Sequence, residues 1–208
     1  MWEKIYKKKK QFSIWPWTEV VSLVNQFFTD KKKKGASVLE LGFGVGANIP
    51  FFLEEKFKYY GIEQSNFAVK FCKKKFKKIK KNLVEGDFTI ISLKKKKFDL
   101  ILDRGSCTHL KYKDFKNFIN AIPEKLNSNG KFIFVDLFSN TTSLNNNYKL
   151  NKVKLKKMGI RNFYNRKMIK NLFKKFNILY LSENIKNIII KNQKVKIATW
   201  SVVIEKKA

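Results

Sequence analysis

The sequence predicts an α/β domain built on a mostly parallel sheet. From Ser37 onwards, apolar runs of strand length alternate with segments of helical periodicity, which is typical of βαβ units. The first apolar run breaks into a turn with glycines at Gly42, Gly44 and Gly46, and glycine lets the backbone lie close to a ligand. Two later runs end in acidic residues, Glu63 and Asp103. Because the carboxyl ends of parallel strands form the ligand-binding edge of an open sheet, we expect these features to meet there.

The N-terminal residues 1–34 are expected to form a helical extension or lid. Residues 1–10 are polar and basic and carry little information. Pro16 disfavours helix for the residue before it, and Thr18 is predicted to cap a helix whose apolar residues recur at helical spacing from Glu19 to Phe28. Trp15 and Trp17 flank the proline, where they either pack at the start of this helix or form an aromatic lid that contacts substrate.

The core is expected over residues 35–208, so that residues 1–208 form a single domain. Strands are predicted at Ser37–Leu41, Tyr59–Glu63, Asn82–Gly86, Phe98–Asp103 and Lys131–Asp136. Helices are predicted at Ala47–Glu55, Phe67–Ile79, Phe115–Leu126 and about Asn165–Phe176. The remaining predicted features are a turn at Asn127–Gly130, a long loop at Ser139–Tyr148 over the carboxyl edge, and an antiparallel edge hairpin made by Ile178–Leu181 and Val195–Ile204.

The net charge of +30 invites a nucleic-acid or anionic-membrane interpretation. Arginine, which suits bidentate phosphate contacts, occurs only at Arg104, Arg161 and Arg166, whereas the lysines gather in runs that read as loops. We favour solvated lysine loops that result from compositional drift, although so positive a field would attract anionic substrates or surfaces.

The cysteines and the apolar runs indicate in which cellular compartment the protein is expected. Cys72 and Cys107 are the only two cysteines and are far apart, which argues against a disulfide framework or a zinc site and for a reducing compartment. No apolar stretch approaches the length of a membrane span, and the N-terminus lacks the apolar core of a signal peptide. We therefore expect a cytoplasmic protein with no transmembrane segment and no metal.

Five motifs resemble those of the class I S-adenosylmethionine-dependent methyltransferases. The acid-x-Gly-x-Gly-x-Gly signature matches Glu40 to Gly46, and the ribose-binding acid of the family matches Glu63, about twenty residues after the glycines. The acid after the third strand matches Asp87, and the fourth-strand and pre-fifth-strand blocks match Phe98 to Asp103 and Asn127 to Gly130. A dinucleotide-binding Rossmann oxidoreductase is the nearest alternative, but its usual G-x-G-x-x-G spacing is absent.

The resemblance implies a Rossmann-like three-layer sandwich with a seven-stranded, mostly parallel sheet whose last strand is antiparallel. It also implies S-adenosylmethionine as the cofactor. Gly42, Gly44 and Gly46 would then pass its methionine part, Glu40 would lie near its amino group, and Asp103 would border the same site. Its ribose would be held by Glu63 with Gln64, and its adenine would meet Asp87 and Phe88.

The loop after the fourth strand is the expected place for chemistry. Methyl transfer is an in-line attack, so the protein aligns the nucleophile and, for a hydroxyl, removes its proton. His109 is the only histidine, and its ordinary pKa near 6.5 suits a general base. We predict that His109, with Asp103, deprotonates or orients an acceptor hydroxyl, while Arg104 holds an anionic part of the substrate or braces the loop. In the alternative, His109 only packs and Arg104 pairs with a nearby acid.

The same loop narrows the acceptor. It lacks the Asn/Asp-Pro-Pro-aromatic sequence of enzymes that methylate base amines and the Pro-Cys of cytosine-C5 enzymes, since Ser106 precedes Cys107. Together with Ser13-x-Trp-Pro-Trp and Asn48-Ile-Pro-Phe-Phe, it is similar to small methyltransferases of sugar or surface-polysaccharide biosynthesis. We favour O-methylation of a small or glycan-like acceptor. Nucleic-acid methylation, or a non-catalytic cofactor-binding scaffold with a basic surface, are the alternatives.

Overall fold

The computed structural model describes residues 1–90, 96–142, 159, 162–190 and 193–207. In these residues a seven-stranded sheet has the order β3-β2-β1-β4-β5-β7-β6. The strands are β1 (Ser37–Leu41), β2 (Lys58–Glu63), β3 (Leu83–Glu85), β4 (Phe98–Arg104), β5 (Leu126–Phe138), β6 (Phe176–Ile190) and β7 (Gln193–Lys206).

Strands β1 to β5 pair in parallel, and β7 runs antiparallel to both β5 and β6. The predicted α/β fold with a reversed last strand is therefore confirmed. The register explains how the site is assembled, because Leu41 on β1 lies opposite Ile62 on β2 and Asp103 on β4. The residues that follow these three positions consequently emerge at one edge of the sheet.

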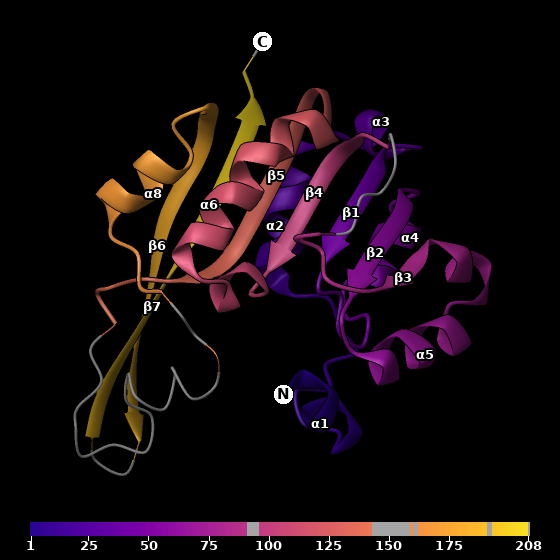
Figure 1. Cartoon of the computed structure of the whole chain (residues 1–208), viewed down its shortest axis with the longest axis horizontal. Coiled ribbons are helices and arrows are strands. Elements are labelled where there is room, and N and C mark those ends of the chain that lie inside the picture. The colour runs from indigo at the N-terminus through magenta and orange to yellow at the C-terminus, as the bar shows by residue number, and fades with distance from the viewer. Residues whose placement is uncertain (91–95, 143–158, 160–161, 191–192, 208) are drawn as a thin grey trace.

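Helices cover both faces of the sheet and make three layers (Figure 1). One face packs against α6 (Tyr112–Ala121) and α8 (Arg166–Leu172), through side chains such as Phe115 and Ile169. The other face packs against α2 (Thr18–Phe27), α4 (Ile49–Glu54) and α5 (Asn66–Lys75), through side chains such as Val20 and Phe52. A further short helix, α1 (Trp2–Lys7), lies beyond the carboxyl ends of the parallel strands (Figure 1).

Several predicted helices have different bounds in the structure. Thr18 is the first residue of α2 rather than its cap, because Trp17 has the extended backbone of the N-cap position. The segment predicted as Phe67–Ile79 ends as α-helix at Lys75 and continues as the 3₁₀ helix η1 (Lys77–Asn82). The one predicted as Phe115–Leu126 begins earlier and ends in the 3₁₀ helix η3 (Ile122–Lys125), where Pro123 lacks the N–H that an α-helix needs.

Two of the predicted connections also differ. Asn127–Gly130 is not a separate turn but the irregular start of β5, where the pairing with β4 shifts register. Of the loop predicted at Ser139–Tyr148, residues 143–148 lie outside the described residues. Ser139, at its start, forms an isolated bridge with Tyr164.

One lysine run is not a solvated loop. Lys31 to Lys33 belong to a short helix, α3 (Asp30–Lys33), and Lys33 is only 4% exposed. Its Nζ lies 2.8 Å from Glu55 Oε2 and 2.6 Å from Asn25 Oδ1. A buried ammonium is tolerated here because acceptors surround it.

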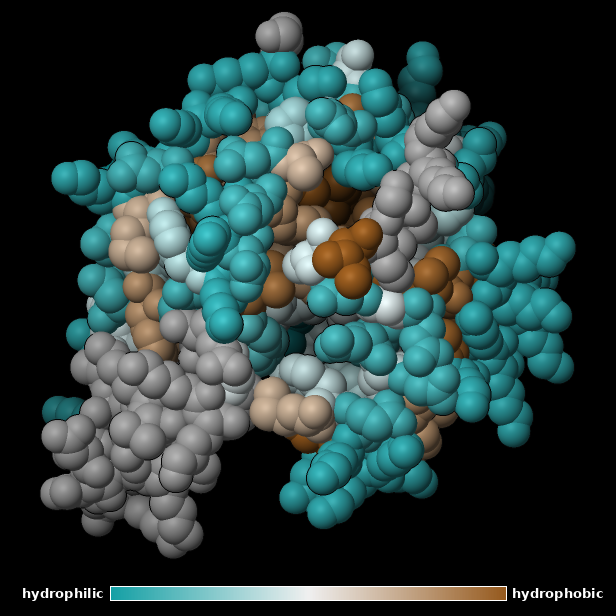
Figure 2. Space-filling view, in the orientation of Figure 1, coloured by the Kyte–Doolittle hydropathy of each residue, from teal (hydrophilic) through white to brown (hydrophobic). Residues whose placement is uncertain are grey.

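Hydrophilic residues cover most of the face seen in Figure 2, in keeping with 46 lysine and arginine residues in the chain. No helix in the described part of the chain is long and apolar enough to cross a membrane. Cys72 and Cys107 are both free and buried.

Candidate functional site

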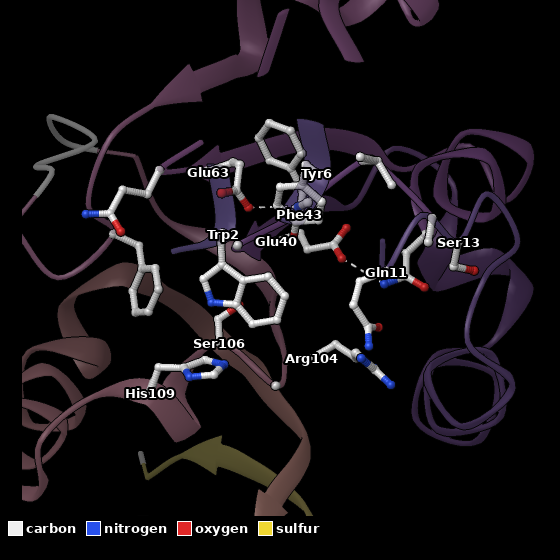
Figure 3. Close-up of a pocket in the computed structure, with 18 of the residues that line it drawn as sticks. Trp2, Tyr6, Gln11, Ser13, Glu40, Phe43, Glu63, Arg104, Ser106 and His109 are labelled. Atoms are coloured by element: carbon white, nitrogen blue, oxygen red, sulfur yellow. Dashed lines mark hydrogen bonds between the residues drawn. The ribbon is translucent and has the colours of Figure 1, made fainter. Parts of the chain in front are cut away.

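A cavity of about 280 Å³ lies at the carboxyl edge of the sheet, where the glycine turn, the ends of β2 and β4 and the N-terminal segment meet (Figure 3). Ten residues predicted from the sequence line it: Trp17, Glu40, Gly42, Gly44, Glu63, Gln64, Asp87, Phe88, Arg104 and His109. Three others do not: Trp15, Gly46 and Asp103.

The glycine turn is shaped by positive φ angles and by close neighbours. Gly42 has φ +64°, and a Cβ there would lie 2.0 Å from Ser106 Oγ. Gly44 has φ +55°, and a Cβ there would lie 2.8 Å from the Tyr6 hydroxyl. Gly46 instead faces Cys72, whose Sγ would lie 2.9 Å from a Cβ, so its lack of a side chain serves helix packing. The turn is therefore in close contact with both the loop after β4 and the N-terminal helix.

Glu63 fixes the end of β2 to this turn. Its Oε2 accepts a hydrogen bond from Gly44 N at 2.8 Å, and its Oε1 accepts one from Ser65 N at 2.8 Å. Burial raises the pKa of Glu63, although these N–H donors oppose the shift. A carboxylate has about four acceptor positions, so each oxygen can accept a further bond from a ligand hydroxyl.

Glu40 is a buried acid beside the turn. Asn48 Nδ2 donates to its Oε1 at 2.7 Å, and the Tyr59 hydroxyl donates to its Oε2 at 2.6 Å. Burial raises the pKa of Glu40 to about 7, against the effect of these two bonds. Asn48 also accepts from Trp17 N at 3.1 Å, so the Trp-Pro-Trp corner is connected to the acid through one side chain.

Asp87 and Phe88 border the cavity beyond β3. Asp87 Oδ1 accepts bonds from the N–H and the hydroxyl of Thr89, at 2.8 Å and 2.7 Å, which holds the chain in a tight turn. The Phe88 ring packs edge-on against Phe118, with 5.4 Å between ring centroids. This part of the cavity is thus an apolar wall beside an oriented carboxylate.

Asp103 lies beneath the loop after β4 rather than in the cavity. It is fully buried, and its Oδ1 accepts hydrogen bonds from Ser106 N at 3.0 Å and Cys107 N at 2.9 Å. Burial raises the pKa of Asp103 to about 7, although the same bonds lower it. Asp103 therefore holds the start of the 3₁₀ helix η2 (Cys107–His109), which carries His109.

His109 faces the cavity from η2 (Figure 3). The Trp2 indole packs edge-on against its ring, with 5.2 Å between centroids. The His109 backbone N donates to Ser106 O at 3.1 Å, which closes the turn of η2. The imidazole thus projects from a loop whose backbone is fixed from below.

Arg104 both lines the cavity and pairs with an acid. Its guanidinium lies 3.5 Å above the Trp17 ring, and its Nη2 lies 3.0 Å from Asp136 Oδ2. Asp136 has the left-handed φ of +67°, an uncommon backbone for a non-glycine residue. Trp15 lies outside this arrangement and is 75% exposed.

The sequence predicted a helical extension or lid over residues 1–34, but not that Trp2 and Tyr6 of α1 reach the cavity. Trp2 and Tyr6 line the cavity, and their rings stack with 5.7 Å between centroids. Because they are four residues apart, both side chains lie on one face of a helix. This spacing could have predicted an aromatic helix face, but the basic composition of residues 1–10 obscured it. Gln11, Ser13, Asn48 and Ser106 also line the cavity and were not predicted to do so.

The described residues contain no group of three or more histidine, cysteine, aspartate or glutamate side chains that could hold a metal ion. The candidate site is a cavity lined by the glycine turn, by the acids Glu40, Glu63 and Asp87, and by the loop that carries His109.

Comparisons with known proteins give a consistent result. A family model described as a methyltransferase domain matches residues 12–183. A search of curated proteins gives no match. Among solved structures, TehB from Haemophilus influenzae has a TM-score of 0.70 at 16% identity, covering 99% of this chain and 67% of that chain.

Two further solved structures have the same fold. An S-adenosylmethionine-dependent methyltransferase from Clostridium acetobutylicum has a TM-score of 0.60 at 16% identity, with 91% of this chain and 89% of that chain covered. A phosphoethanolamine N-methyltransferase from Haemonchus contortus, solved with phosphomonomethylethanolamine and S-adenosylhomocysteine, has a TM-score of 0.70 at 13% identity and coverages of 94% and 54%. At such identities the likeness concerns the fold alone.

Proposed function

The chain belongs to the methyltransferase domain family, and from this premise we propose that it transfers a methyl group from S-adenosylmethionine to the hydroxyl of a small or glycan-like acceptor. The observation that carries the proposal is that Gly42, Gly44, Glu40 and Glu63 border one cavity together with His109. When bound, S-adenosylmethionine supplies an electrophilic methyl group on its sulfonium.

The cavity lining fits this cofactor. Gly42 and Gly44 line the cavity with backbone atoms alone, and the Tyr6 hydroxyl lies beside Gly44. Glu63 retains acceptor positions for ribose hydroxyls, and Glu40, which also lines the cavity, retains acceptor positions for the cofactor's amino group. Asp87 and Phe88 offer a carboxylate and an apolar ring for adenine.

The chain's own residues then divide the work of positioning. The glycine turn and Glu63 hold the cofactor, while Asp103 fixes the backbone of the loop that presents His109. His109 is the general base that takes the proton from the acceptor hydroxyl. Arg104, held by Asp136 and stacked on Trp17, forms the wall against which the acceptor lies. Its positive charge makes the site prefer acceptors that carry anionic groups.

The test is release of S-adenosylhomocysteine in the presence of a panel of sugars, nucleotide sugars and RNA. We expect turnover with a hydroxyl-bearing small molecule or glycan-like acceptor. RNA-dependent turnover, with binding that weakens steeply as salt is raised, would replace this acceptor class by nucleic acid. If the chain binds the cofactor tightly but releases no S-adenosylhomocysteine with any of the acceptors, the result would support a non-catalytic scaffold.

His109→Ala tests the base. General-base catalysis contributes typically 10²–10⁴-fold, so we expect kcat with the true acceptor to fall by about a hundredfold or more, with cofactor affinity retained. The pH dependence that a titrating base gives to the wild-type rate should also disappear. Full turnover of His109→Ala would show that the base role is wrong.

A further inference from the structure

We propose that helix α1 is a working part of the cofactor-binding site, in which Glu3 is the residue that docks the helix and Tyr6 the residue that closes the cavity over the glycine turn. The inference rests on the proposed function, because it concerns retention of the same cofactor. It assigns a role to residues 2–7, whose sequence alone gave little information.

Glu3 docks α1 onto the start of α5. Its Oε2 accepts hydrogen bonds from Ser65 Oγ at 2.5 Å and from Phe67 N at 3.1 Å. Ser65 is the N-cap of α5 and in turn accepts from Ala68 N at 3.2 Å. A carboxylate is favoured at this position because a helix N-terminus presents unpaired N–H groups and a positive dipole end.

The electrostatics of Glu3 agree with this contact. The bond from Ser65 and the neighbouring Lys7 and Phe67 N lower the pKa of Glu3 to about 2. Lys7 Nζ lies 3.0 Å from Glu3 Oε1, one turn along α1. Glu3 is thus charged at any physiological pH, and both of its oxygens are engaged.

The helix has little else to hold it. It spans six residues, and none of them is buried. A helix this short is not stable alone in water, and an element with few buried contacts opens readily. Its position therefore depends on the Glu3 contacts and on the side chains that it places in the cavity.

Those side chains reach both halves of the site. The Tyr6 hydroxyl lies so close to the glycine turn that a Cβ on Gly44 would be 2.8 Å from it. Trp2 stacks on Tyr6 and contacts the His109 ring. Its indole lines the cavity (Figure 3). The cofactor is consequently enclosed only while α1 is docked, and undocking of α1 opens the way for S-adenosylhomocysteine to leave.

The experiment compares Glu3→Ala and Tyr6→Ala with wild type and with a matched control, Glu85→Gln. Glu85, the last residue of β3, also contacts the start of α5, because its Oε2 accepts from Asn66 Nδ2 at 2.6 Å, but it does not line the cavity. Affinity for S-adenosylhomocysteine is measured by calorimetry and its dissociation rate by stopped-flow tryptophan fluorescence. Thermal unfolding of the cofactor-free proteins reports any loss of fold.

Loss of a hydrogen-bonded charged group should weaken S-adenosylhomocysteine binding by about tenfold or more in Glu3→Ala, mainly through faster dissociation. Tyr6→Ala should show the same defect. Glu85→Gln should bind and release S-adenosylhomocysteine as wild type does, and the unfolding temperatures of all three variants should stay close to that of wild type. In hydrogen exchange, S-adenosylhomocysteine should protect the amides of α1 in wild type but not in Glu3→Ala.

Wild-type affinity and dissociation rate in both Glu3→Ala and Tyr6→Ala would overturn the inference. An equal loss in Glu85→Gln would also overturn it, because the effect would then belong to α5 in general. If wild type itself bound no S-adenosylhomocysteine, the proposed function would fail first, so the two failures can be told apart.

Discussion

Replacement of Gly42 by alanine tests whether the glycine turn and the loop after β4 are packed as closely as the structure indicates. The new Cβ would lie 2.0 Å from Ser106 Oγ and 2.9 Å from Ser106 Cβ. The left-handed φ of +64° adds a backbone cost of roughly 1–2 kcal/mol for a non-glycine residue. Overpacking of this kind costs roughly 1–3 kcal/mol, so Gly42→Ala should lower the free energy of unfolding by about 3 kcal/mol in total.

The steric part can be separated from the backbone part by trimming Ser106. Ser106→Ala removes the oxygen of the 2.0 Å contact but leaves the carbon of the 2.9 Å contact, whereas Ser106→Gly removes both. Each change also removes the bond from Ser106 Oγ to Leu41 O, which spans 3.0 Å and contributes about 1 kcal/mol. Relief of the clash should therefore make the Gly42→Ala cost smaller by about 1–2 kcal/mol in the Ser106→Gly background, with a smaller gain in Ser106→Ala.

Urea unfolding followed by circular dichroism measures these free energies, and calorimetry on the same proteins measures the affinity for S-adenosylmethionine. We expect Gly42→Ala to lose cofactor affinity as well, because the turn must move away from Ser106. If the costs of Gly42→Ala and Ser106→Gly simply added, within about 0.5 kcal/mol, the close packing inferred here would be refuted.

Two further predictions concern the buried acids. The pKa values of Glu40 and Asp103 rise from 4.5 and 3.8 to about 7 through burial, so the folded state holds more protons than the unfolded state within that window. Their stabilising contribution is therefore present at the acid end of the window and is lost as the pH rises through about 7. Urea unfolding should show that the free energy of unfolding of wild type is lower at pH 8 than at pH 5, and that Asp103→Asn makes this difference smaller. An equal difference in both proteins would contradict this expectation. Tyr59→Phe removes the donor to Glu40 Oε2 inside the core and should cost about 1–3 kcal/mol of unfolding free energy, whereas an unchanged urea midpoint would show that the bond contributes nothing.

Much of the fold could be predicted because its signals are local. Most of the predicted strands were short apolar runs, and the one predicted from Phe98 to Asp103 agrees with β4 to within one residue. The place of Glu63 followed from the same pattern, since the acid at the end of β2 accepts from Gly44 of the glycine turn once β1 and β2 pair in register. Periodicity and strand ends therefore predict which residues reach the edge of the sheet.

The remaining features depend on contacts between irregular segments that leave no period in the sequence. Glu3 meets Ser65 across 62 positions, and Lys33 meets Glu55 across 22. The orientation of Asp103 was equally hidden, because it depends on two backbone N–H groups of the following loop rather than on a side-chain partner. The proposed roles of Trp15 and His109 stay predictions, with Trp15 75% exposed and His109 in the cavity lining.

A calorimetric titration of the wild-type chain decides whether the cavity beside Gly42 and Gly44 binds S-adenosylmethionine. We predict that the wild-type chain binds one S-adenosylmethionine, that S-adenosylhomocysteine competes for the same site, and that a nicotinamide dinucleotide gives no heat. Absence of heat at high micromolar S-adenosylmethionine, or binding of the dinucleotide in its place, would show that the cavity is not an S-adenosylmethionine site.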